Sequence, residues 1–162
     1  MLNSDLERQL ARIEPSVRDR GVLLYPCSVE CKNGTILRCV YMVTEADFLH
    51  LTGSARPRDT PWIPSEDIAS MQESPMRLPP QFANELYQAG ESGMGYRVFT
   101  VVFSWWCRQE YAQAFVDFIE YPPGKGPSYV RAVLPHVGGR RRPKPQPVIY
   151  WCLVSKTGAG PR

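Results

Sequence analysis

The stretch VECKNGTILRCV, residues 29–40, decides the fold, because two apolar segments rich in β-forming residues flank a turn. Asn33-Gly34 is typical of a two-residue β-hairpin turn, since both residue types tolerate the positive φ angles of a type I′ turn. Such a turn fixes the register of the two strands. It predicts three cross-strand pairs: Cys31 with Ile36, Val29 with Arg38, and Cys27 with Val40.

This register places apolar residues on both faces of the hairpin. One face is expected to carry Cys27, Val29, Cys31, Ile36 and Val40. Arg38 is the polar exception on that face. The opposite face carries Leu37, Cys39 and Tyr41, which indicates that it too is partly covered. Strands covered on both faces are typical of a barrel or a sandwich.

A second hairpin is predicted by a weak internal repeat. The segment from Val29 to Gly53 aligns with the segment from Val101 to Gly124, and both are expected to form a strand, a turn and a strand. In each copy an Asp-Phe pair then begins a third apolar run, which predicts a strand at residues 48–51 in the first copy.

The repeat aligns Asn33-Gly34 with Trp105-Trp106. A tryptophan at positive φ costs about 1–2 kcal/mol, so the second hairpin is expected to use a longer loop or a bulge. Its indoles must then be covered by another part of the chain or by a partner. Adjacent residues of an extended chain point to opposite faces, and we therefore expect one indole to be packed and one to be exposed.

The remaining sequence predicts short helices and further strands. A capping-box pattern from Ser4 to Glu7 indicates a helix at about residues 5–13, and RLPPQFANELYQAG, which ends at Gly90, indicates another at about 80–89. Short strands are expected at 62–63 and 68–72, a helical turn at 128–134 and a closing strand at 148–154, in which Tyr150 and Trp151 are expected to be core residues.

The predicted fold class is mainly β, with two small, strongly bent, antiparallel SH3-like barrel units in tandem and a single β-sandwich as the alternative. The 16 prolines and 12 glycines among 162 residues suit many short strands and turns. Five parts are expected: an N-terminal helix and lead-in at 1–20, a first small barrel unit at 21–76, a helical connector at 77–95, a second small barrel unit at 96–155 and a flexible tail at 156–162.

The N-terminal residues favour a cytoplasmic protein. Asp5 and Glu7 interrupt the start of the chain, which has no apolar core of a signal peptide, and we expect the mature chain to begin there. No segment approaches the roughly 20 apolar residues of a membrane helix, so a membrane is not an expected partner.

Five cysteines are present, an odd number whose spacing matches no common zinc pattern. Cys27 and Cys31 are four residues apart in a predicted strand, which separates their Cα atoms by about 13 Å. A disulfide requires about 5.5 Å. The sequence therefore predicts buried reduced thiols and no metal site.

No residue pattern calls for an enzyme. Only His50 and His136 could act as acid–base groups near neutral pH, and His50 is expected to be half-buried in a strand. A triad of Cys107, His136 and Asp117 can be formulated, but its spacing has no support. The glycines of GESGMG and PPGKGP do not stand where a dinucleotide fingerprint or a P-loop needs them. We expect no catalytic residue and no cofactor.

Two features favour binding. The segment HVGGRRRPKPQP, residues 136–147, concentrates positive charge between glycines and prolines that keep the chain extended, which suits contact with phosphate or another acidic surface. Exposed aromatic side chains beside such a loop are the combination used by proteins that bind single-stranded nucleic acid. The predicted ligand-binding residues are Arg140, Arg141, Arg142, Lys144, Trp105 and Trp106.

These features predict a non-enzymatic binding module for nucleic acid, a nucleotide or another phosphate-bearing ligand. The alternative is a protein-interaction or oligomerisation module, whose partner is another protein or a further copy of this chain. Trp105 and Trp106 then form a buried hot spot of the interface. Steep salt dependence would favour the first hypothesis and weak salt dependence the second.

Basic residues ahead of a β-barrel resemble the arrangement in the cyclic-dinucleotide-binding PilZ family. Arg18 and Arg20 stand where that resemblance places basic residues. The family's Asp/Asn-x-Ser-x-x-Gly signature does not follow the second predicted strand, so the sequence does not assign the chain to this family.

Overall fold

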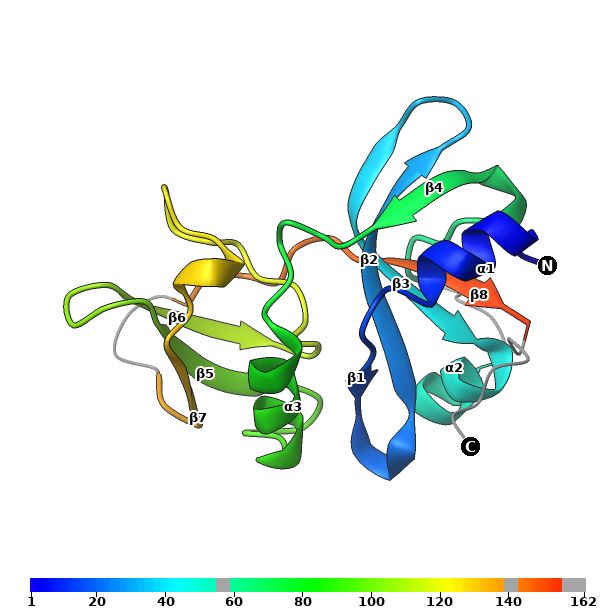
Figure 1. Ribbon diagram of the computed structural model, residues 1–162. Coiled ribbons are helices and arrows are strands. Elements are labelled where there is room, and N and C mark those ends of the chain that lie inside the picture. Colours follow the sequence, from blue (N-terminus) through cyan, green and yellow to red (C-terminus); the bar gives the residue numbers. More distant parts are fainter. Residues whose placement is uncertain (55–58, 139–142, 156–162) are drawn as a thin grey trace. The chain divides into compact units, whose positions relative to one another are not determined.

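The computed structural model describes residues 1–54, 59–138 and 143–155. The chain is mainly β, with two sheets and a few short helices (Figure 1), and it divides into two compact units. Unit 1 is built from residues 1–15, 20–74 and the segment that begins at Ile149, and unit 2 from residues 16–19 and 75–148. Neither sheet closes into a barrel within the described residues, so the expected barrel closure is not observed.

Unit 1 is organised around a long antiparallel hairpin. Strands β2 (Leu23–Cys31) and β3 (Ile36–Thr44) form it, β4 (Ile68–Gln72) pairs antiparallel with β2, and β8 (Tyr150–Val154) pairs parallel with β3. The sequence correctly predicts β4 at its observed bounds. It places the closing strand in the second unit, whereas β8 adds to the sheet of unit 1, because an apolar run does not specify which strand it pairs with.

The turn of this hairpin differs from the predicted one. The N–H of Gly34 donates to the carbonyl oxygen of Cys31 at 2.8 Å, and the N–H of Cys31 donates to the carbonyl oxygen of Thr35 at 2.8 Å. The side chain of Asn33 accepts from the N–H of Thr35 at 2.9 Å. Only Gly34 of the Asn-Gly pair has positive φ, at 86°. The loop is therefore a three-residue loop with its glycine in the left-handed region, not a type I′ turn.

This extra loop residue shifts the register near the turn. Ile36 pairs with Glu30, not with Cys31, and its side chain is 62% exposed, so the expectation that it faces the core is wrong. A register shift between Cys27 and Val29 restores the predicted pairing of Cys27 with Val40. The bulge explains why the core face is otherwise correct: Cys27, Val29, Cys31 and Val40 are all buried.

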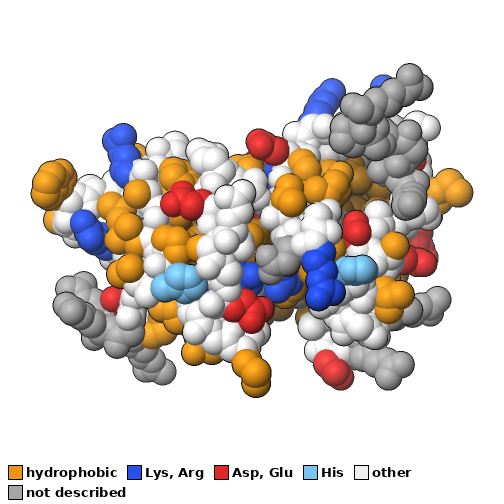
Figure 2. All heavy atoms as spheres, turned by 90° about the horizontal axis from the view of Figure 1, so that it is seen from below, with side chains coloured by type: hydrophobic (Ala, Val, Ile, Leu, Met, Phe, Trp, Pro, Cys, Tyr) orange, Lys and Arg blue, Asp and Glu red, His pale blue; other side chains and the backbone are white. Residues whose placement is uncertain are grey.

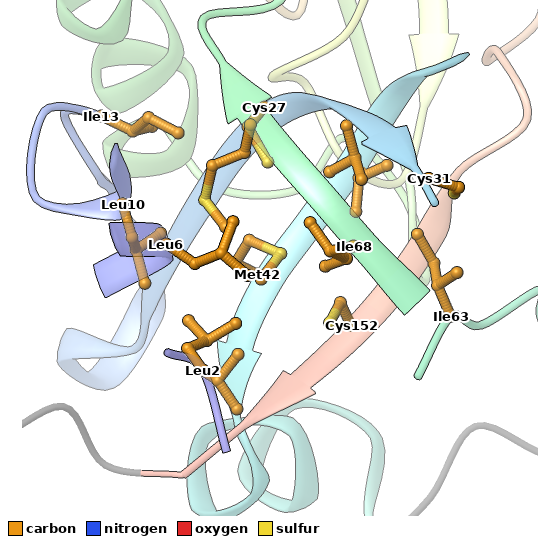
Figure 3. Packing of buried hydrophobic residues seen from close by; sticks show 14 residues of the cluster. Leu2, Leu6, Leu10, Ile13, Cys27, Cys31, Met42, Ile63, Ile68 and Cys152 are labelled. Carbon is orange, nitrogen blue, oxygen red and sulfur yellow. The ribbon is translucent and has the colours of Figure 1, made fainter. Parts of the chain in front are cut away.

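Helix α1 (Ser4–Leu10) covers one face of unit 1. Its N-cap is Asn3, whose side chain accepts from the N–H groups of Asp5 and Leu6 at 3.1 and 2.9 Å, not the predicted Ser4. Figure 3 shows its apolar side chains directed into a core that also contains three cysteines. The labelled residues of this core are Leu2, Leu6, Leu10, Ile13, Cys27, Cys31, Met42, Ile63, Ile68 and Cys152.

Helix α2 (Glu45–Thr52) replaces the strand that the sequence predicts at 48–51. The side chain of Thr44 caps its first turn, and Gly53 ends it with φ at 68°. Acidic residues in the first turn also favour the helix over a strand. Phe48 is buried and meets the ring of Trp151 edge to face, with 5.2 Å between centroids, so the helix covers the second face of the sheet.

Unit 2 consists of helix α3 and a three-stranded antiparallel sheet. The helix is Pro80–Gln88, close to the predicted bounds, and Gly90 follows it with φ at 78°. The strands are β5 (Arg97–Val102), β6 (Arg108–Gln113) and β7 (Ala132–Pro135), in the order β6-β5-β7. The helical turn predicted at 128–134 is a 3-10 turn, η3 (Pro127–Tyr129), followed by β7.

Three further short elements complete the described chain: β1 (Ser16–Val17), η1 (Asp19–Gly21) and η2 (Ser65–Asp67). Within unit 2, β1 contacts α3, and the N–H of Val17 donates to the side chain of Asn84 at 2.9 Å. The buried carboxylate of Asp117 accepts hydrogen bonds from the hydroxyls of Ser16 and Tyr87. Burial together with this carboxylate raises the pKa of the Tyr87 phenol.

All five cysteines lie in the described chain, and none of them forms a disulfide. Only Cys107 is not fully buried. Burial raises the pKa of Cys39 to about 11 and that of Cys152 to about 12. These two thiols therefore stay protonated near neutral pH, which makes them poor nucleophiles.

Candidate functional site

The turn between β5 and β6 carries two exposed indoles. Trp105 is 90% exposed and Trp106 is 87% exposed. The prediction that one indole packs and the other does not is therefore wrong, because the two residues lie at the tip of a turn beyond the sheet and not in extended chain. Figure 2 shows hydrophobic side chains that protrude at the end of unit 2 where the β5–β6 turn lies in Figure 1, with Lys or Arg side chains near them.

The turn avoids the strain that two tryptophans would suffer in a type I′ turn. Residues 103–107 separate the two strands, and two residues of this segment, Phe103 and Ser104, lie opposite Cys107, in agreement with the predicted longer loop or bulge. The carbonyl oxygen of Cys107 accepts from the N–H groups of Phe103 and Ser104 at 2.9 and 3.2 Å, and the N–H of Cys107 donates back to Ser104 at 3.4 Å. Neither Trp105 nor Trp106 has positive φ. The backbone can therefore hold both indoles outward without a glycine.

The base of this turn is fixed in the core of unit 2. Phe103 is 3% exposed, and its ring meets that of Tyr121 edge to face with 5.9 Å between centroids. Further along the hairpin, Phe99 and Tyr111 stack with 5.4 Å between centroids. The exposed indoles therefore stand on a packed, hydrogen-bonded hairpin, which limits the conformational entropy that a ligand would have to remove.

Two shallow grooves flank the turn. The first has a volume of about 450 Å³ and includes both indoles, and the second has about 460 Å³ and includes Trp105. Trp105 and Arg108 line both grooves, so one indole and one guanidinium separate two concave surfaces. The first groove is completed by Thr100, Gln109, Glu110, Leu134 and Val137, and the second by Val102, Phe103, Ser104 and Arg131.

Two arginines give the turn a positive charge. Arg108 and Arg131 are exposed, and within the described parts of the chain neither guanidinium forms an ion pair. Strand pairing places both arginines beside Val102 of β5. Arg108 of β6 lies directly opposite Val102, and Arg131 precedes Ala132, the residue of β7 that pairs with Val102. Sequence reasoning missed both residues, because only the register of three strands brings them together. We name Trp105, Trp106, Arg108 and Arg131 the hairpin patch.

The predicted basic loop is described only at its two ends. Arg140, Arg141 and Arg142 lie outside the described residues. Lys144 is described, and its ammonium group pairs with the carboxylate of Glu120 at 3.2 Å, while its N–H donates to the carbonyl oxygen of Glu110 at 3.2 Å. At the other end, a Cβ on Gly138 would lie 3.7 Å from the carboxylate of Glu110. Both described ends therefore lie against Glu110, in the strand that follows the tryptophan turn.

The other residues considered from the sequence lie elsewhere. His50 is exposed on α2 and is not half-buried in a strand. His136 is exposed, with its ring nitrogens near the hydroxyl of Ser92 and the carbonyl oxygen of Ala89, at 2.8 and 2.9 Å. Trp151 is buried in unit 1 as expected, and Tyr150 is half-buried.

Comparisons with protein-family models, with curated proteins and with solved structures found no match. Among the described residues, no group of three or more His, Cys, Asp or Glu side chains could hold a metal ion. No helix in the same residues has the length and apolar character needed to span a membrane. The candidate site therefore rests on the geometry and charge of the hairpin patch.

Proposed function

We propose that this protein is a non-enzymatic binding module whose hairpin patch engages a flexible phosphate-bearing strand, with single-stranded nucleic acid as the foremost ligand. The observation that carries this proposal is the near-complete exposure of two adjacent indoles, at 90% and 87%. In this proposal Trp105 and Trp106 stack on bases, and Arg108 and Arg131 contact phosphates. Arg140, Arg141, Arg142 and Lys144 stay candidate phosphate contacts on the strength of the sequence alone.

The energetics of stacking favour this ligand class. A base that stacks on an aromatic side chain contributes about 1–3 kcal/mol, without dependence on base identity. Two indoles on one turn offer two such contacts. Guanidinium groups beside them supply charge-assisted hydrogen bonds to phosphate oxygens, which neutral residues could not. The grooves on the two sides of Trp105 give room for successive bases of one strand.

The proposal also retains two features that the sequence suggests. It places the protein in the cytoplasm, as the N-terminal residues and the cysteine spacing of the sequence suggest. It treats each β unit as a small SH3-like scaffold, used in tandem, on which turns and loops carry the binding residues.

Fluorescence anisotropy with a labelled oligothymidylate of about 12 nucleotides tests this function, since known sites span about 4–16 nucleotides. Changing Trp105 and Trp106 together to serine should weaken binding more than about tenfold. Trp62→Ser is the matched control, because Trp62 is 54% exposed but belongs to unit 1. Equal affinity in the double variant and the parent would contradict the proposal.

Salt titration of the same complex tests the phosphate contacts. Each phosphate contact to a single strand contributes about −0.7 to the slope of log affinity against log salt. Arg108→Gln and Arg131→Gln should each reduce the steepness by about that amount. An unchanged slope in both variants would show that these arginines do not contact phosphate.

A second candidate function is a protein-interaction module. Apolar residues line the grooves beside the indoles, among them Val102, Leu134 and Val137, and Trp and Arg dominate the hot spots of protein interfaces. This candidate predicts self-association or partner binding that barely responds to salt. Light-scattering mass with and without oligonucleotide separates the two: a dimer mass that Trp105→Ser and Trp106→Ser abolish would favour the second.

A further inference from the structure

A second concave site lies in unit 1 and is independent of the hairpin patch. Its volume is about 240 Å³, which is below the roughly 300 Å³ at which pockets for drug-sized ligands begin. The pocket therefore suits a group of side-chain size. It is lined by Glu45, Trp62, Ile63, Pro64, Ser65, Glu66 and Leu153.

Backbone hydrogen bonds fix the aromatic wall of this pocket. The N–H of Ile63 donates to the carbonyl oxygen of Trp151 at 2.8 Å, and the N–H of Trp151 donates to that of Pro61 at 3.0 Å. Trp62 lies between these two bonds and forms a parallel bridge with Trp151. Its side chain nevertheless remains 54% exposed. The strand β8 thus holds Trp62 in place, while its indole stays available.

The two carboxylates come from separate elements. Glu45 is the first residue of α2, whose first turn the Thr44 side chain caps, and Glu66 lies in η2, which a hydrogen bond from Asp67 to Pro64 closes at 3.1 Å. Figure 1 shows α2 beside β8, the strand that contributes Leu153. The acidic groups are therefore positioned by α2 and η2, both of which contact β8.

The charge of the pocket is negative and is not balanced within it. No Lys, Arg or His is among its described lining residues, and neither Glu45 nor Glu66 forms an ion pair within the described chain. An indole face attracts cations through its quadrupole, and tryptophan is the strongest of the aromatic side chains in this respect. Carboxylates beside an indole add Coulomb attraction for the same ligand.

We propose that this pocket binds an organic cation, an alkylammonium group of the size of a lysine side-chain end. The apolar walls from Ile63, Pro64 and Leu153 accommodate the alkyl part, Trp62 faces the cation, and the two carboxylates select its charge. The two units then take ligands of opposite charge, because the hairpin patch combines indoles with arginines and this pocket combines an indole with glutamates.

Choline serves as the test compound, and its uncharged carbon isostere, dimethylbutanol, serves as the comparison. The protein has four tryptophans, so two-dimensional NMR resolves four indole N–H signals, and Trp62→Phe assigns one of them. Choline should shift the Trp62 signal saturably and leave those of Trp105 and Trp106 in place. Dimethylbutanol should bind at least about tenfold more weakly, because it lacks the charge. Equal shifts with both compounds would overturn the proposal.

Variants separate the role of charge from that of shape. Glu45→Gln and Glu66→Gln together should weaken choline binding by about tenfold or more, and Glu7→Gln in α1, an equivalent charge change outside the pocket, should have no effect. Trp62→Phe should retain part of the affinity, and Trp62→Ala should lose it. Unchanged affinity in the folded glutamine double variant would overturn the proposal. Choline tests only the pocket of unit 1, and the oligonucleotide tests only the hairpin patch. A negative choline result therefore does not affect the proposed function.

Discussion

The two hairpin turns of this protein solve the same problem in different ways. The turn between β2 and β3 uses Gly34 at positive φ, and its other residues are polar. The turn between β5 and β6 uses no positive φ at Trp105 or Trp106, and places both indoles in solvent. In the first turn the residue types follow from what the backbone requires. In the second turn the backbone would accept smaller and more polar residues.

This difference separates residues that the fold needs from residues that it only presents. Phe103 and Trp105 are two positions apart, yet one is 3% exposed and the other 90%. Burial of a large aromatic side chain stabilises the folded chain, whereas an exposed indole contributes little to folding. Stability therefore does not account for the exposed pair of indoles, and the proposed ligand does.

The largest expected effect tests this separation at the hairpin base. Phe103→Ala should lower the free energy of unfolding by about 3–5 kcal/mol, because it removes a buried ring that packs on Tyr121. Trp105→Ala should change it by less than about 0.5 kcal/mol, as for other exposed positions. Chemical denaturation of the two variants, both of which lie in unit 2, measures the two changes in the free energy of unfolding. Comparable losses in the two variants would show that Trp105 belongs to the packed core.

A smaller effect is expected at the first turn. Gly34→Val should destabilise the fold by about 1 kcal/mol or more, since valine resists the φ of 86° that this position adopts. Trp106→Val is the matched control in the second turn, where positive φ is not required, and it should leave the melting temperature nearly unchanged. If valine is tolerated equally at both positions, the conformational contrast between the turns is wrong.

The sequence predicted the elements that depend on local chemistry. The first hairpin, β4 and α3 follow from alternation, turn residues and a proline at a helix start, and they lie close to the expected positions. The predictions were wrong where contacts with residues distant in sequence determine the secondary structure or the register. Capping by Thr44 and packing of Phe48 on Trp151 turned an apolar run into α2, and an extra residue in β3 between Leu37 and Val40 corrected a register that the turn had shifted. The pairing partner of β8 had no local indication.

The site was predicted only in part for the same reason. Trp105 and Trp106 stood out because their position in the repeat conflicts with turn chemistry, and that conflict identified the exposed turn. Arg108 and Arg131 are ordinary residues in sequence, and they join the indoles only through the pairing of β5 with β6 and β7. Lys144 was counted as a ligand residue, but its ammonium group pairs with Glu120, which reduces its availability.

The smallest expected effect on stability comes from exchanging the turn chemistry itself. Changing Trp105 to Asn and Trp106 to Gly introduces the residue pair of the first turn into the second. The present closing bond from Cys107 to Ser104 is long, at 3.4 Å, so little hydrogen-bond energy is at risk. Asn-Gly also reaches the turn conformations that short hairpins prefer. The free energy of unfolding should therefore stay level or rise by up to about 0.5 kcal/mol.

The same exchange should remove oligonucleotide binding, because both stacking surfaces are lost while the fold remains. Thermal unfolding and anisotropy on one protein preparation measure the two outcomes together. Retained stability with lost binding would show that the indoles serve a ligand. A loss of more than about 1 kcal/mol in stability would instead show that the indoles support the hairpin, since exposed positions away from special features rarely cost that much. In that case the two turns would differ in packing, and the exposure of Trp105 and Trp106 would no longer support the hairpin patch as a binding site.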